Sequence, residues 1–147
     1  GNYGFPNLTD DDWIWGGEPD QIVATLNTGR VAAMPAWSAA LGESGINDVT
    51  EHLLTFTGRS TDAEAAARGE SQFGMFCAAC HGADAKGNHL LGAPNLTDDI
   101  WLYGGSADSI KHTLRNGRAG VMPKFGDTLS EEQIHLLAGY VYGLSRQ

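Results

Sequence analysis

Two cysteines and a histidine lie within five residues near the middle of the chain. The sequence CAACH occupies positions 77–81, so Cys77 and Cys80 are three residues apart and His81 follows directly. This C-x-x-C-H pattern is the attachment signature of c-type haem. Two thiols at this spacing, at the end of a helix, can each bond a vinyl-derived carbon of a porphyrin, and His81 can then bind the iron. The pattern therefore predicts one covalent haem c.

Two other uses of a C-x-x-C pair fit the chain less well. A thioredoxin-like redox pair follows a strand in a βαβ unit, and no convincing alternating strand is predicted here. A zinc site needs four ligands, and the chain has only these two cysteines. The remaining histidines have no ligand spacing and are expected at the surface; they are His52, His89, His112 and His135.

The sixth iron ligand is expected to be a methionine. A His–Met pair raises the haem potential and leaves no open position on the iron. Met122 precedes Pro123 and follows His81 by 41 positions, in a loop after a predicted helix. Met34 stands in the same setting before Pro35. We predict Met122 as the axial ligand, with ordinary core packing as the alternative, and Met34 as a ligand only if a first haem is present.

The chain contains a tandem repeat. The sequence PNLTDD occurs at 6–11 and again at 94–99, a shift of 88 positions. The same shift aligns tryptophans, glycine pairs, Gly-Arg dipeptides and Met-Pro dipeptides without a gap. A period this long indicates duplication of one module rather than a solenoid.

The two copies are unequal in length. The segment from Thr61 to Gly92, which holds the C-x-x-C-H sequence, has no counterpart before the first copy. We interpret 1–59 as the C-terminal part of a first module that is truncated at its N-terminus, and 60–147 as a complete second module. We expect the first part to dock on the second module or to be completed by residues outside this chain.

The local signals predict an all-α fold with long loops. Capping boxes are read at Thr61–Glu64 and Ser130–Gln133, Ser106 is read as an N-cap, and Pro19 as a first helical residue. The expected helices cover residues 19–28, 44–56, 63–76, 106–116 and 130–143.

CAACHG with the later Met122-Pro123 resembles class I cytochrome c. The duplicated PNLTDD…W…GG and G-R…M-P blocks resemble the dihaem cytochrome c subunit (subunit III) of cbb3-type cytochrome c oxidases, over nearly the whole chain. The resemblance implies one haem c per module, an N-terminal membrane helix and a periplasmic position. It also implies electron transfer from a soluble donor toward the catalytic subunit. This sequence differs in lacking the anchor and the first C-x-x-C-H.

Further residues could support the haem. Arg118, like its counterpart Arg30, could pair with a haem propionate, because a guanidinium suits a carboxylate. Trp101 and Tyr103 could line the haem pocket, although core packing explains them equally well. Asn95 is expected to shape the loop on the histidine side.

Composition narrows the possible partners. The formal net charge of −9 argues against nucleic acid and favours a basic electron donor. No run of about 18 apolar residues suggests a membrane span within the sequence. Beyond an oxidase subunit, two hypotheses stay open: a free soluble dihaem electron carrier, and a haem enzyme or gas sensor with an open iron position.

Overall fold

The computed structural model describes residues 1–146, in which six helices and two short strands alternate with long loops. In chain order the elements are α1 (Pro19–Thr28), β1 (Arg30–Met34), α2 (Ser38–Thr55), α3 (Ala63–Phe76), α4 (Ala78–His81), α5 (Ala107–Asn116), β2 (Arg118–Met122) and α6 (Glu131–Leu144). The helix-rich prediction is confirmed. Helix α2 begins earlier than expected because a first turn joins it across a kink at Gly42, where φ is 62°.

Most helix starts follow the local capping chemistry. Ser106 accepts a hydrogen bond from the backbone N–H of Ser109. Ser130 and Gln133 form the expected capping box. Helix α3 begins at Ala63 as predicted, but its N-cap is Asp62 rather than Thr61, and the Asp62 side chain accepts from the backbone N–H of Ala65. The Thr61 N–H donates instead to Glu51 of α2, at 2.8 Å, so this turn ties two helices together.

The two strands were not predicted from the sequence. They form an antiparallel ribbon in which Arg30 lies opposite Met122 and Met34 lies opposite Arg118. Each strand follows a glycine with positive φ, Gly29 at 65° and Gly117 at 70°. A Cβ at either glycine would collide with a main-chain oxygen of the other strand. Glycine is therefore required where the strands enter the ribbon.

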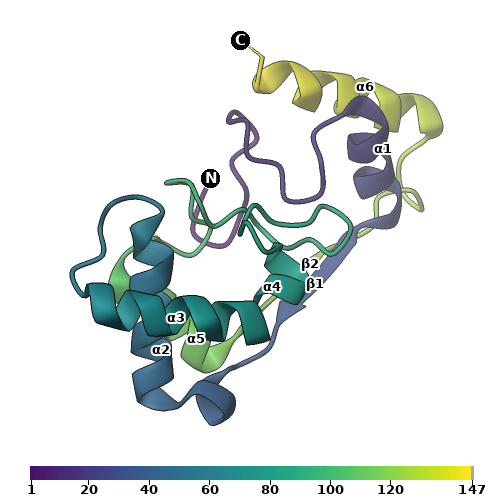
Figure 1. Ribbon diagram of the computed structural model, residues 1–147. Helices are drawn as coiled ribbons and strands as arrows, with labels where there is room; N and C mark the ends of the chain where they lie inside the picture. The colour runs from purple at the N-terminus through teal and green to yellow at the C-terminus, as the bar shows by residue number, and fades with distance from the viewer. Residues whose placement is uncertain (147) are drawn as a thin grey trace.

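The helices form two lobes with the ribbon between them (Figure 1). The first lobe contains α2, α3, α4 and α5, and α2 packs against both α3 and α5. The second lobe contains α1 and α6, which pack against each other. The first core is larger and includes Ile46, Val49 and Cys77, whereas the second is built around Ile22, Leu26 and Ile134.

Each lobe draws helices from both sequence modules. Helix α2 belongs to the first copy of the repeat but packs with α3 and α5 of the second. Helix α6 ends the second copy but packs with α1 of the first. Helices of residues 1–59 thus pack with helices of residues 60–147. The division into two modules at residues 59 and 60 stays a prediction about the sequence. Among residues 1–146, no helix combines the length and the apolar character needed to cross a membrane.

Candidate haem-binding site

The CAACH segment forms a tight corner at the end of α3. Cys77 ends α3 and also begins the one-turn helix α4, with its N–H bonded to the carbonyl of Phe73 at 2.8 Å. The His81 N–H donates to the carbonyl of Cys77 at 3.0 Å. This turn makes Cys77 part of the first core and leaves Cys80 exposed, both as free thiols. One sulfur therefore lies in the core and the other at the surface.

The side chain of His81 is held in one orientation. Its Nδ1 lies 3.0 Å from the carbonyl oxygen of Pro94. Because a carbonyl can only accept, Nδ1 carries the proton and Nε2 keeps its lone pair for a metal. Burial lowers the pKa of His81, although the bond to Pro94 partly opposes this. Burial favours the neutral imidazole and the bond to Pro94 orients it, and a neutral, oriented imidazole is the form that binds iron.

The Cys77 thiol does not have the character of a redox-active cysteine. Burial, with a smaller contribution from Cys80, raises the pKa of Cys77 to about 11. A catalytic C-x-x-C cysteine has a lowered pKa because the thiolate is the nucleophile. A thioether sulfur is neutral, so it suits this apolar place. Within residues 1–146 no group of three or more His, Cys, Asp or Glu side chains is arranged to hold a metal ion.

The loop that carries Pro94 is fixed by its own hydrogen bonds. The Leu96 N–H donates to Ala85, and the Gly87 N–H donates to His81, both at 2.8 Å. Asn95 accepts from the backbone N–H of Thr97 at 3.0 Å and donates to Asp98 at 2.6 Å. The Asn95 side chain is therefore used within the loop that carries Pro94, whose carbonyl oxygen is the acceptor for His81.

Arg118 is half-buried at the start of β2. Its Nε donates to the hydroxyl of Thr113 at 2.9 Å, and its Cζ lies 4.3 Å from the ring centre of Tyr103. Tyr103 in turn meets Tyr3 edge to face, with ring centres 5.5 Å apart. The Nη2 atom of Arg118 is buried and has no hydrogen-bond partner. A buried guanidinium nitrogen with an unused donor suits an anionic ligand.

Trp101, which was also predicted to line the haem pocket, lies beside the first core. It packs against the first core, and its indole N–H donates to the carbonyl of Asp98 at 2.9 Å. The indole is thus anchored to the loop that follows Asn95.

Comparison with known proteins gives the family. A family model described as "Cytochrome C oxidase, cbb3-type, subunit III" matches residues 64–141. The chain belongs to this family. It is similar to "Cbb3-type cytochrome c oxidase subunit CcoP" of Cereibacter sphaeroides, with 43% identity over 98% of this chain and 53% of the relative. The CcoP of Rubrivivax gelatinosus is also 43% identical, over 99% of this chain and 48% of the relative. The FixP subunit of Azorhizobium caulinodans is 42% identical, over 98% and 52%.

The chain spans about half the length of these curated relatives. Membership of a cytochrome c family implies a covalently bound haem c. The residues around CAACH fit such a group: the thiols adjoin an oriented imidazole, and the unused N–H of Arg118 could donate to a propionate. Cys77, Cys80 and His81 would hold the haem, which would supply a one-electron redox centre.

The structure brings only one of the two Met-Pro methionines to this core. Met34 packs against the cluster that contains Cys77, Ile110 and Leu114. Met122, the ligand predicted from the sequence, packs instead against the second core with Ile22 and Leu26. The structure therefore does not bring Met122 together with Cys77 and His81. The signal that could have pointed to Met34 was the repeat itself, since both methionines share the same local sequence.

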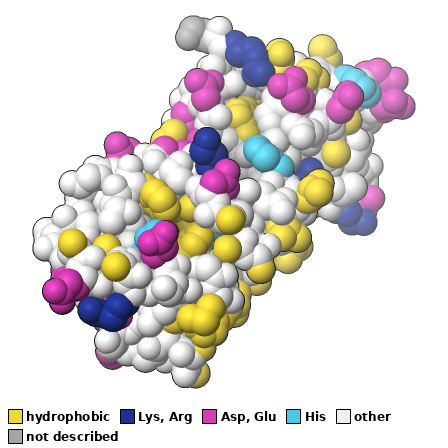
Figure 2. All heavy atoms as spheres, viewed as in Figure 1, with side chains coloured by type: hydrophobic (Ala, Val, Ile, Leu, Met, Phe, Trp, Pro, Cys, Tyr) yellow, Lys and Arg dark blue, Asp and Glu magenta, His cyan; other side chains and the backbone are white. Residues whose placement is uncertain are grey.

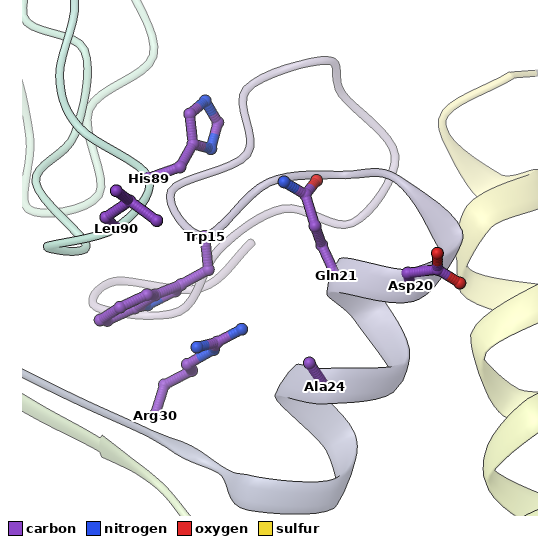
Figure 3. Close-up of a pocket in the computed structure, with 7 residues that line it drawn as sticks. All are labelled: Trp15, Asp20, Gln21, Ala24, Arg30, His89 and Leu90. Atoms are coloured by element: carbon purple, nitrogen blue, oxygen red, sulfur yellow. The ribbon is translucent and has the colours of Figure 1, made fainter.

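A hollow lies beside α1 in the second lobe (Figure 3). In this view, the ring of Trp15 lies between the Arg30 guanidinium and the loop that carries His89 and Leu90. The remaining lining residues are on α1; they are Asp20, Gln21 and Ala24. Arg30 lies 4.7 Å from the Trp15 ring centre and bonds Thr25 at 2.9 Å, which repeats the arrangement of Arg118. No cysteine lines this hollow, so it offers no covalent attachment.

Proposed function

We propose that this chain is an electron-transfer haem c protein that passes electrons from a soluble donor toward the catalytic subunit of a cbb3-type oxidase. The observation that carries the proposal is the oriented His81 within CAACH, in a chain that belongs to the subunit III family. The names of the relatives favour an oxidase subunit over a free carrier.

In this proposal the protein residues hold and tune a single haem. Cys77 and Cys80 attach it, and His81 binds the iron through Nε2 while Pro94 fixes the ring. A Met-Pro methionine supplies the sixth ligand, and Arg118 binds a propionate. Trp101 and Tyr103 line the same side. With a histidine and a methionine both held for the iron, the protein would leave the bound haem no open position for ligand chemistry.

The proposed partners are the other oxidase subunits and a basic soluble donor. Residues 1–60 carry a formal charge of −6 and residues 61–147 carry −3, which gives the total of −9. Acidic side chains gather most densely at the α1 and α6 end of the face in Figure 2. We place the protein on the periplasmic side of the bacterial inner membrane, held there by an anchor outside this sequence, since haem is attached to C-x-x-C-H proteins after export.

Two measurements test this function: carbon monoxide binding to the ferrous protein and the salt dependence of its reduction rate. The ferrous protein should not bind carbon monoxide, because a sixth protein ligand occupies the iron. Its reduction by a basic cytochrome c, followed by stopped flow, should slow as ionic strength rises from low to physiological. Ready carbon monoxide binding would favour a gas sensor or haem enzyme, and a rate unaffected by salt would count against electrostatic docking.

A further inference from the structure

We propose that the outer face of the β1–β2 ribbon holds this chain to another subunit of the oxidase, which offers a matching apolar and uncharged surface. We call this face the ribbon patch; it consists of Val31, Ala33, Ala119 and Val121. The proposal rests on the proposed function and deepens it, because it places one of the two kinds of partner on a defined part of the chain.

The first step is the polarity of the ribbon, which is the reverse of what a strand facing water usually shows. Successive side chains of a strand point to opposite faces, and the solvated face ordinarily carries the polar ones. Arg30 begins β1 and Arg118 begins β2, and both are half-buried. Val31 and Val121, which follow the other face, are 72% and 76% exposed. The outer face of the ribbon therefore has the composition of a face that is covered.

The second step is the register of the ribbon, which joins the four side chains into one patch. Val31 lies directly opposite Val121, and Ala33 lies directly opposite Ala119. Side chains opposite each other in an antiparallel pair have Cβ atoms about 5 Å apart. Single exposed apolar residues are common on protein surfaces, but a contiguous group marks a contact surface.

The third step is the lack of charge around the ribbon patch. The sequence VAAMPAWSAALG at 31–42 and the sequence AGVMP at 119–123 contain no charged residue, in a chain in which 18% of the residues are charged. Pro35, Ala36 and Pro123 lie in these segments and are also exposed. Figure 2 shows hydrophobic side chains along the edge of the molecule where Figure 1 places the ribbon. Lasting subunit interfaces are depleted of charge in the same way.

The fourth step compares the partners that such a surface could bind. A basic soluble donor is attracted by carboxylates and must leave again after each electron, so the acidic end of α1 and α6 suits it better. A membrane surface attracts basic side chains, and the ribbon patch has none. An apolar, uncharged protein surface matches the ribbon patch. The proposed function supplies such a partner, because it makes the chain one subunit of an oxidase.

Two double variants of opposite charge test the ribbon patch. Val31→Lys with Val121→Lys, and Val31→Glu with Val121→Glu, change side chains that are exposed in the isolated chain, so both should keep the wild-type unfolding midpoint. The variants are made in the gene of the host, and the oxidase is purified in mild detergent through its catalytic subunit. Both should lower the amount of this chain that co-purifies by about tenfold or more, because each would bury unpaired charges. The control Leu90→Lys changes a side chain that is 90% exposed outside the ribbon patch, and it should co-purify fully.

The outcomes of the co-purification separate the ribbon patch from the function on which it rests. Full co-purification of both double variants would overturn the ribbon patch as the interface. A gain with one sign of charge and a loss with the other would also overturn it, because that pattern indicates a charged partner. A wild-type chain that purifies without any oxidase subunit would instead refute the proposed function itself.

A photo-cross-link identifies the occupant of the ribbon patch in the assembled oxidase. A benzophenone side chain at position 121 is irradiated in intact cells, and the products are identified by peptide mass spectrometry. Products that contain a peptide of another oxidase subunit support the proposal, and position 90 is the control that should give none. Products with a second copy of this chain, with lipid, or with no oxidase subunit would overturn the proposal.

Discussion

Helices α2 and α6 are counterparts in the repeat, yet one is covered and the other is open. On α2, Ile46 and Val49 are fully buried against α3 and α5. On α6, only Ile134 and Ala138 are buried, and Tyr140 is 67% exposed. Within residues 1–146, α3 is the one helix that is directly followed by CAACH. The comparison indicates that packing against α3, rather than the repeat pattern, determines where the larger core forms.

The largest expected effect is the loss of covalent haem attachment, which only the first lobe can provide. Replacing Cys77 and Cys80 together by serine should abolish covalent haem attachment, because no other thiol exists in the chain. The measurement is haem retention after denaturation and acid–acetone extraction. His135→Ala on the exposed face of α6 is the control and should retain haem. Haem that resists extraction in the double variant would contradict the site.

Truncating one core isoleucine in each lobe compares how much the two cores contribute to the unfolding free energy. Ile46 and Ile134 are counterparts, at 0% and 1% exposure. We expect Ile46→Ala to cost about 3–5 kcal/mol and Ile134→Ala about 2–3 kcal/mol of unfolding free energy, because the smaller second core relaxes more easily. Urea unfolding of both variants measures this. A larger loss for Ile134→Ala would mean that the second lobe carries the stability of the molecule.

A smaller effect is expected at the contact between α2 and α3. Arg68→Gln would leave the buried carboxylate of Asp48 without its two hydrogen bonds and should lower the unfolding midpoint. Arg115→Gln is the matched control, since its partner Glu43 is exposed and such pairs contribute little. Equal unfolding midpoints for the two variants would show that the Arg68–Asp48 pair does not stabilise the packing of α2 against α3.

The smallest expected effect is a pH dependence of the unfolding free energy that arises at Asp12, next to the first PNLTDD sequence. Partial burial, with Asp98 and Asp10 nearby, raises the pKa of Asp12 to about 6. A raised pKa means that the folded state holds the proton more tightly than the unfolded state. The stabilisation is therefore complete below about pH 4 and is lost as pH rises through 6. Asp12→Asn should flatten this part of the stability profile, whereas an unchanged profile would refute the repeat–repeat contact.

The sequence predicted the helices well because their signals are local. Pro19, Ser106 and Ser130 act within one turn, and the glycines after α1 and α5 end those helices. The CAACH corner was likewise readable from five residues. Asn95 accepts a hydrogen bond within the loop that carries Pro94, and its part in a haem site stays a prediction.

The ribbon and the packing of α2 against α3 could not be predicted in this way. Strands β1 and β2 are five residues each and lack clear alternation, so their pairing arises only when distant segments meet. Helices α2 and α6 carry the same apolar spacing, which leaves the partner of α3 undecided. The difference between Asp48 and Leu136 was visible in the repeat alignment, but its meaning depends on Arg68 lying opposite.

The number of haems bound per chain is the decisive measurement for the proposed haem site. We expect a haem-to-protein ratio of one for the purified 147-residue chain, because the first lobe alone combines two thiols with an oriented histidine. The haem should be found on the peptide that contains Cys77 and Cys80. A ratio of zero, or a ratio of two with haem also held by the α1 and α6 lobe, would contradict it.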